Sequence, residues 1–325
     1  STPHNDLFLQ TFSNPSRAAA HLRTLVPSEV AHLAVWGEMR LAPSEFASIG
    51  QGSRRSDLLF EVPLATPPEC ASTAEAASSM LLYVLFEHQS TVDRDMAVRM
   101  LIYMALTWDT WLRERAGSNE PLPFIYPLVL YHGSDRWTAK TQFADLFRGP
   151  PALVDALRPY IPSFEYQIED LRHDEGSPTV DDPIAQAVLS VFESREFGSA
   201  LLALRRAFDS LDEQLNEDED AKAACKSLVV YVLLAFEDSD TEALRRALDR
   251  PGTPAGEIVM TGGQQLIEQG IEQGIEQGIE QGIEQATRTM VARLIALGVD
   301  TDTIVRAAEI DVATIERIRV ANAPE

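Results

Sequence analysis

The sequence predicts an α/β fold whose core has the element order αβββαβ, followed by a helical C-terminal region. The stretch Met80–Phe86 is a run of apolar, branched and aromatic residues too short for a typical helix, which is typical of a strand buried on both faces. The next stretch, Asp93–Arg115, repeats Met and aromatic residues at helical spacing. Phe124–Tyr131 is a second short apolar run. These three elements predict a buried strand, a covering helix and a further strand.

One helix and two strands are expected before the Met80 strand. Apolar residues between Asp6 and about Leu25 follow a helical spacing, and Pro27 ends this predicted helix. A weak strand is predicted between Trp36 and Phe46, and another over Arg54–Val62. Residues 63–79 are rich in Pro, Ala, Ser and Thr and are expected to form a long connection.

The Met80 strand ends in a polar group that predicts a metal site. Side chains alternate along a strand, so Glu87 and Gln89 point to one face and His88 to the other. A buried carboxylate is costly unless a partner satisfies it. If Arg54–Val62 pairs with the Met80 strand, Asp57 lies beside Glu87. Two carboxylates and the His88 backbone carbonyl would then bind Mg²⁺, with Mn²⁺ as an alternative, and Gln89 would orient the attacking water for phosphodiester hydrolysis.

Further residues are accessory candidates for this site. His4, Asn5 and Asp6 open the first helix, where they either join the site or simply cap the helix. His132 ends the strand Phe124–Tyr131 and either approaches the metal or is a structural histidine. Arg55 precedes Asp57 and is a candidate for phosphate contact.

Four motifs support a resemblance to a known family. They are Pro3-His4-Asn5-Asp6-Leu7-Phe8, Arg55-Ser56-Asp57-Leu58-Leu59-Phe60, Leu85-Phe86-Glu87-His88-Gln89-Ser90 and Pro127-Leu128-Val129-Leu130-Tyr131-His132-Gly133. In this order they resemble motifs of the Rpn family of recombination-promoting nucleases or transposases, within the PD-(D/E)XK nuclease superfamily, and Phe164–Leu171 resembles a further family strand. The resemblance covers about the first half of the chain. It implies a restriction-endonuclease-like core and a Mg²⁺-dependent DNA endonuclease linked to recombination or mobile elements.

Two departures from the family pattern keep other functions open. Asn5 stands where the family has an early Asp, and Leu9 stands where it has Lys. Asn offers a metal only a neutral oxygen, so one alternative is a catalytically weak or inactive nuclease fold that binds DNA or serves assembly. Another is a hydrolase that uses the same metal site on a small phosphate ester.

The composition is that of a globular protein, with 45% hydrophobic and 24% charged residues among 325. Two cysteines, Cys70 and Cys225, are too few for a disulfide framework or a cysteine metal site. No stretch resembles a signal peptide or is long enough to span a bilayer, so we expect a cytoplasmic protein that does not interact with membranes.

The charge of the chain argues against a nonspecific nucleic-acid binder. The net charge is −23, and phosphate affinity comes largely from Lys and Arg. Residues 1–140 carry 11 Lys and Arg against 15 Asp and Glu, so most of the acidic excess lies outside the predicted core. Near the site, Arg94 and Arg99 follow the Glu-His-Gln turn and are either phosphate contacts or solvated charges.

The C-terminal part is predicted to be helical. A Gly-Ile-Glu-Gln repeat lies between Leu266 and Gln285, and a row of residues four apart drifts around a helix instead of forming a heptad seam. It is expected to be a helical linker that self-associates, giving a homo-oligomer, or a flexible tether. The three short helices after it resemble either a helix-turn-helix or an assembly bundle. The predicted organisation is a nuclease-like core, a helical region, the repeat linker and a helical tail, over residues 1–175, 176–260, 261–285 and 286–325.

Overall fold

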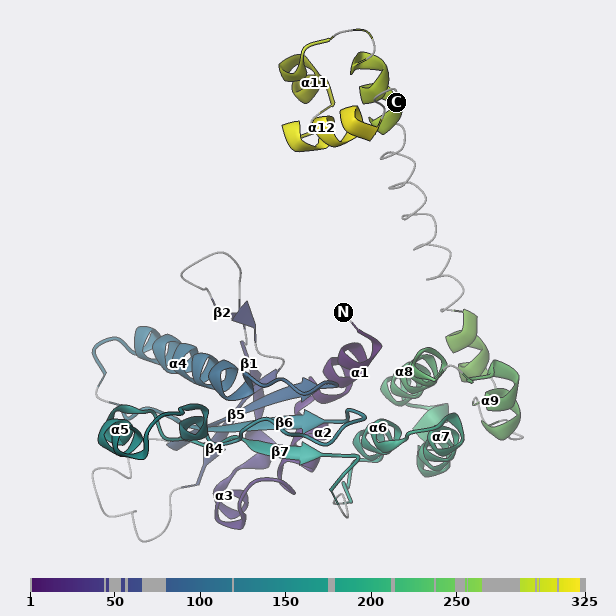
Figure 1. Cartoon of the computed structure of the whole chain (residues 1–325). Coiled ribbons are helices and arrows are strands. Elements are labelled where there is room, and N and C mark those ends of the chain that lie inside the picture. The colour runs from purple at the N-terminus through teal and green to yellow at the C-terminus, as the bar shows by residue number, and fades with distance from the viewer. Residues whose placement is uncertain are drawn as a thin grey trace. The chain divides into compact units, whose positions relative to one another are not determined.

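We describe the protein from a computed structural model (Figure 1). The residues that the structure describes are 2–43, 45–46, 54–55, 58–65, 80–118, 120–174, 179–211, 214–236, 238–248, 255, 257–264, 287–295, 297, 299–308 and 310–321. The chain divides into two compact units, Ser1–Gly263 and Gln264–Glu325, each with its own hydrophobic core.

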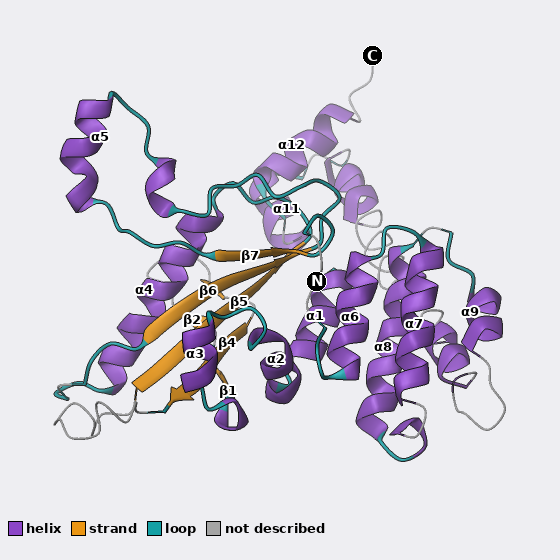
Figure 2. Ribbon diagram, turned by 90° about the horizontal axis from the view of Figure 1, so that it is seen from below, coloured by secondary structure: helices purple, strands orange, loops and turns teal. Residues whose placement is uncertain are grey.

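A five-stranded mixed sheet forms the centre of the first unit (Figure 2). Its order is β1-β4-β5-β6-β7. The strands are β1 (Arg40–Ala42), β4 (Leu58–Leu64), β5 (Met80–Gln89), β6 (Phe124–Tyr131) and β7 (Gln167–Asp170). β1, β4 and β5 pair antiparallel, whereas β5, β6 and β7 run parallel. Two further short strands, β2 (Glu45–Phe46) and β3 (Arg54–Arg55), pair with each other in a separate ladder. The predicted α/β class is therefore confirmed.

Helices share a hydrophobic core with one face of the sheet, and they include those that follow residue 175. They are α1 (Pro3–Phe12), α2 (Pro15–Leu22), α6 (Pro183–Glu193), α7 (Phe197–Leu211), α8 (Glu219–Ala235) and α9 (Thr241–Leu248), with a further helical stretch over residues 257–264. Phe60, Val84, Phe86 and Leu130 from the sheet pack into one core with these helices. The helical region of residues 176–260 thus shares its core with the sheet.

Helix α4 (Met96–Glu114) covers the other face. Leu59, Leu85 and Val129 of the sheet pack there against Met100 of α4 and Tyr166. The connection from β6 to β7 contains α5 (Pro151–Leu157), which projects from the sheet in Figure 2. The remaining short helices are α3 (Ser28–Leu33), η1 (Trp36–Glu38), η4 (Phe143–Leu146), η5 (Arg158–Tyr160) and η6 (Gln214–Asn216).

The prediction of one helix from Asp6 to about Leu25 is wrong. Two helices, α1 and α2, occupy this stretch because Pro15 has no amide hydrogen to continue α1. Asn14 instead caps α2, since its side-chain oxygen accepts hydrogen bonds from the Ser16 and Arg17 amides at 3.0 and 3.4 Å. The Asn14-Pro15 pair inside the apolar pattern is the sequence feature that indicates this break between two helices.

Within its described residues, the second unit contains the three short helices expected from the sequence. Residues 287–295 are helical and are followed by α11 (Thr301–Ala308) and α12 (Val312–Ala321). Their core is small and consists of Val291, Ile304, Ile315 and Ile318. Residues 265–286, which hold most of the Gly-Ile-Glu-Gln repeat, lie outside the described residues.

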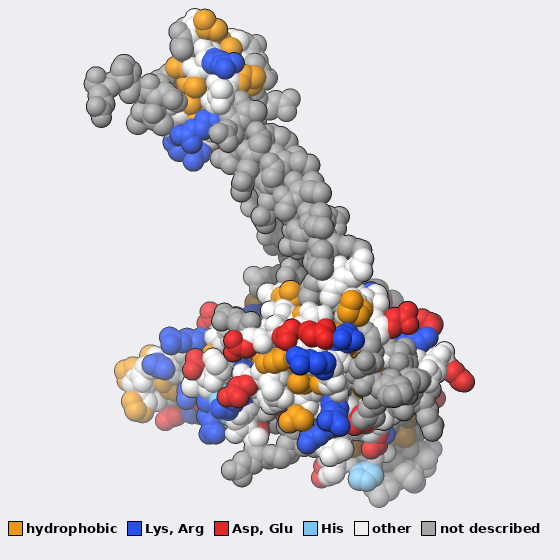
Figure 3. Space-filling view, turned by 90° about the vertical axis from the view of Figure 1, so that its right-hand side faces the viewer, with side chains coloured by type: hydrophobic (Ala, Val, Ile, Leu, Met, Phe, Trp, Pro, Cys, Tyr) orange, Lys and Arg blue, Asp and Glu red, His pale blue; other side chains and the backbone are white. Residues whose placement is uncertain are grey.

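Two features of the described residues concern the partners considered from the sequence, DNA and membranes. On the side of the first unit that faces the viewer in Figure 3, acidic and basic side chains are interspersed. Among the described helices, none combines the length and the apolar character needed to cross a membrane.

Candidate functional site

Glu87 lies at the carboxyl end of β5 and is fully buried. Its side chain points to the α4 face, because Arg99 of α4 reaches its Oε2 at 3.0 Å. The neighbouring His88 points to the opposite face, where it stacks on Phe8 of α1. The alternation that the sequence predicts at this strand end is therefore present in the structure.

Arg99 joins two carboxylates on the α4 face. One terminal nitrogen donates to Glu87, and the other donates to Asp93 Oδ2 at 2.8 Å. Burial alone would lower the pKa of Arg99, but its hydrogen bonds to Asp93 and Tyr103 and the negative charge of Glu87 raise this pKa above its ordinary value. The guanidinium therefore stays charged and compensates the buried Glu87 carboxylate.

The other predicted members of the site are described only in part. Gln89 is half-buried, and its alternation along β5 places it on the same face as Glu87. Asp57 lies outside the described residues, and the ladder between β4 and β5 is described only as far as Leu58 opposite Phe86. Arg55 lies in β3, where its backbone is opposite that of Glu45 in the ladder with β2.

Asp170 lies at the carboxyl end of β7, the same end of the parallel strands as Glu87, and the sequence did not predict it as part of the site. It ends β7, is 4% exposed, and accepts a hydrogen bond from the Trp137 amide at 3.1 Å. Its other oxygen lies 2.8 Å from His173 Nδ1. The only sequence signal was the position of Asp170 near the end of the predicted strand Phe164–Leu171. Because both of its oxygens hold neighbouring segments in place, we assign it a structural role.

Three histidines gather on the opposite face of the sheet. His88 stacks on His132 with ring centroids 4.9 Å apart, and His4 lies 4.8 Å from His132. His132 also stacks on Phe192 of α6, and His4 Nδ1 lies 2.8 Å from the Tyr231 hydroxyl of α8. The structure therefore does not bring His4 or His132 to the side of the sheet where Glu87 lies.

Burial keeps these imidazoles neutral. It lowers the pKa of His88 to about 3 and, with help from the nearby His88 and His4, lowers that of His132 to about 2. Burial also lowers the pKa of His4. Stacked rings do not direct their nitrogen atoms to one point, and within the described part of the chain no three His, Cys, Asp or Glu side chains are arranged to hold a metal ion.

Asn5 and Asp6 lie in the first turn of α1 and do not cap it. The cap is Thr2, whose hydroxyl accepts a hydrogen bond from the Asn5 amide at 3.4 Å, and Pro3 opens the helix. Asn5 is half-buried and Asp6 is exposed. Their position is that of ordinary first-turn residues.

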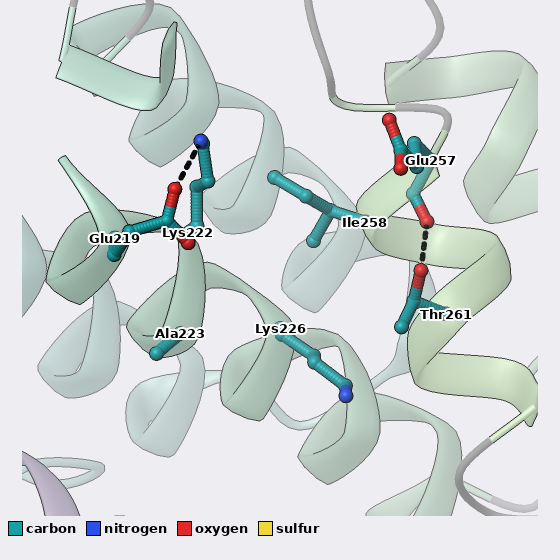
Figure 4. Close-up of a pocket in the computed structure, with 7 residues that line it drawn as sticks. All are labelled: Glu219, Lys222, Ala223, Lys226, Glu257, Ile258 and Thr261. Carbon is teal, nitrogen blue, oxygen red and sulfur yellow. Dashed lines mark hydrogen bonds and ion pairs between the residues drawn. The ribbon is translucent and has the colours of Figure 1, made fainter. Parts of the chain in front are cut away.

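A shallow pocket of about 420 Å³ lies elsewhere, between α8 and residues 257–264 (Figure 4). It is lined by an ion pair between Lys222 and Glu219 at 2.6 Å and by Lys226 and Glu257. Its charges are mixed, and none of the predicted site residues lines it.

The sheet and its polar strand end lie within the part of the chain that matches a known family. A family model described as "Putative transposase, YhgA-like" matches residues 2–222. The chain belongs to this family. The resemblance to the Rpn nucleases drawn from the four motifs is thereby confirmed.

Curated relatives match a shorter stretch of the chain. Recombination-promoting nuclease RpnD of Escherichia coli O157:H7 is 28% identical over 134 residues, which are 41% of this chain and 46% of RpnD. Recombination-promoting nuclease RpnA of Escherichia coli K12 is 29% identical over 133 residues, or 41% of each chain. The K12 protein named "Inactive recombination-promoting nuclease-like protein RpnE" is 26% identical over 133 residues, 41% of this chain and 40% of RpnE. Each alignment spans less than half of the relative. No solved structure matches the chain.

Proposed function

We propose that this protein is a divalent-metal-dependent endonuclease that cuts DNA, with a PD-(D/E)XK-type core and its site at the carboxyl end of β5. The observation that carries the proposal is the Glu87 carboxylate, which is fully buried at a strand end and forms an ion pair with Arg99. Burial of a carboxylate is costly unless charged or hydrogen-bonding groups compensate it. The relatives named recombination-promoting nucleases favour the same function and suggest a role in recombination.

The donors on this face suit a hard cation. Glu87 supplies a carboxylate oxygen and His88 a backbone carbonyl oxygen, which are ligand types that Mg²⁺ and Mn²⁺ prefer. The described β4–β5 ladder ends with Leu58 opposite Phe86, and in the sequence Asp57 directly precedes Leu58 while Glu87 directly follows Phe86. This register supports Asp57 as the second carboxylate ligand.

Each residue of the proposed site then has a distinct role. Asp57, Glu87 and the His88 carbonyl oxygen hold the cation, which, when bound, polarises the phosphate and lowers the pKa of a water molecule. Gln89 lies two residues beyond Glu87 on the same face and orients that water. The stacking of His88 on Phe8 and His132 fixes the end of β5 from behind, which keeps the carbonyl and the two flanking side chains in place.

Plasmid cleavage tests this proposal. The parent should nick or cut DNA in Mg²⁺ or Mn²⁺ but not in EDTA, and Asp57→Asn and Glu87→Gln should abolish this cleavage. Gln89→Ala should slow cleavage and spare metal affinity. A matched control is Glu61→Gln, since Glu61 is also a buried carboxylate on β4, paired with Arg40 and with Tyr83 at 3.0 Å, but belongs to no predicted site. Cleavage that survives chelation, or that Glu61→Gln abolishes equally, would contradict the assignment.

A second candidate is a DNA-binding or assembly protein whose nuclease fold has lost activity. Asn5 replaces a family acid, and one relative, RpnE, is named inactive. Metal-independent shifts of DNA in a gel without any cleavage would favour this function over the first.

A further inference from the structure

The side chain of Arg99 lies beside Glu87, the carboxylate that we propose as a ligand of the cation. Its terminal nitrogens lie 3.0 Å from Glu87 Oε2 and 2.8 Å from Asp93 Oδ2, so a single guanidinium bridges both carboxylates. The Arg99 side chain is 33% exposed and that of Asp93 25% exposed, whereas Glu87 has no exposed surface. Arg99 can therefore move toward solvent, and Glu87 cannot.

Asp93 is a fixed second anchor for Arg99. One of its oxygens accepts a hydrogen bond from the Asp95 amide at 2.9 Å, just before α4 begins, and the other accepts from Arg99. Rotation of the Arg99 side chain about its link to Asp93 would break the contact with Glu87 and keep the contact with Asp93. After such a rotation Arg99 would remain charged and paired with Asp93.

Charge repulsion disfavours simultaneous binding of Arg99 and a cation to the same buried carboxylate. A divalent ion bound to Glu87 would lie within a few ångströms of the guanidinium, and like charges repel strongly where water is scarce. We propose that Arg99 is the resident counter-ion of Glu87, that a divalent metal must displace it to bind, and that Asp93 retains the displaced guanidinium. This inference rests on the proposed metal-dependent function. It makes Arg99 a positioning residue that sets the metal affinity.

Mn²⁺ binding to the chain of residues 1–325, followed by the electron paramagnetic resonance signal of free Mn²⁺, tests the inference without any cleavage assay. Arg99→Gln should tighten Mn²⁺ binding by roughly tenfold or more, because the competing charge is gone. Asp93→Asn should weaken it several-fold, since Arg99 then loses its second carboxylate and keeps its ion pair with Glu87. Arg113→Gln is the matched control. Arg113 belongs to the same helix and pairs with Asp109 on the surface, so its loss removes one charge without touching Glu87.

A double-mutant comparison makes the test specific. In a Glu87→Gln background, Arg99→Gln should no longer change Mn²⁺ affinity. Circular dichroism checks that each variant is folded, and if Arg99→Gln unfolds the protein, the opposite shift expected for the partly exposed Asp93 decides the question. Unchanged or weaker binding in Arg99→Gln, or tighter binding in Asp93→Asn, would overturn the inference.

The two proposals can fail separately. If the parent bound no Mn²⁺, or if binding did not depend on Asp57 and Glu87, the metal-dependent function and the inference would both fall. If binding needed both carboxylates but Arg99→Gln matched Arg113→Gln, only the role of Arg99 would be wrong.

Discussion

His132 should make this protein lose stability in mild acid. Its side chain is 2% exposed and stacks between His88 and Phe192. Burial, followed by the nearby His88 and His4, lowers its pKa to about 2 from an ordinary value of 6.5. Between these two values the unfolded chain binds a proton that the folded chain does not. The folded state is therefore destabilised as the pH falls below 6.5.

The size of the effect follows from the same shift. Each pH unit below the unfolded-state pKa removes about 1.4 kcal/mol for one such group. At about pH 5 the contribution of His132 alone is a loss of roughly 2 kcal/mol relative to neutral pH. His132→Phe keeps a flat ring in the stack and cannot bind a proton, so its unfolding free energy should fall less over the same interval.

Urea unfolding followed by tryptophan fluorescence, at neutral pH and at about pH 5, measures this difference. The parent should lose roughly 2 kcal/mol more than His132→Phe between the two conditions. His32→Gln is the control, because His32 is exposed and its removal should leave the pH dependence of the parent intact. Equal losses in the parent and in His132→Phe would refute the argument that this imidazole is buried uncharged.

Three further predictions concern stability and assembly. Asn14→Ala removes the cap of α2 and should lower stability by about 1 kcal/mol in a thermal or denaturant titration; an unchanged midpoint would contradict the role of the cap. Gly133→Ala places a methyl group against the Tyr131 hydroxyl and should cost about 1–3 kcal/mol by the same measurement, whereas Gly149→Ala, whose nearest neighbour would lie 3.7 Å away, should be close to neutral. Deleting residues 264–325 should leave the melting transition of the first unit in place, because the two units have separate cores. It should also lower the number of subunits per particle measured by light scattering; an unchanged number of subunits would contradict self-association through the tail.

Elements dominated by local pattern were predictable from the sequence. The strand expected over Phe124–Tyr131 is β6 with the same bounds, and the helix expected over Asp93–Arg115 is α4. Burial on both faces leaves a strand little choice but a continuous apolar run, so such strands are visible in a sequence. The single helix over Asp6–Leu25 failed because local cap chemistry at Asn14 outweighed the apolar spacing.

The surroundings of the site depended on contacts distant in sequence and could be predicted only in part. The alternation of side chains along a strand correctly predicts that Glu87 and His88 point to opposite faces. The sequence leaves Arg99 as either a phosphate contact or a solvated charge, and nothing in it indicates the ion pair with Glu87. The stacking of His88 on His132 depends on the parallel pairing of β5 with β6, and the approach of His4 depends on the packing of α1. The spacing of apolar residues along the chain does not reveal contacts between residues so distant in sequence.

The opposite orientations of Glu87 and His88 restrict how the gene can change. Inserting or deleting one codon within Met80–Phe86 would shift the register by one residue and exchange the two faces. Glu87 would then enter the aromatic stack, and the imidazole would face Arg99. We therefore expect length variation in this family to avoid the strand and to fall in connections such as residues 66–79, where a change in length leaves the order of faces in β5 untouched.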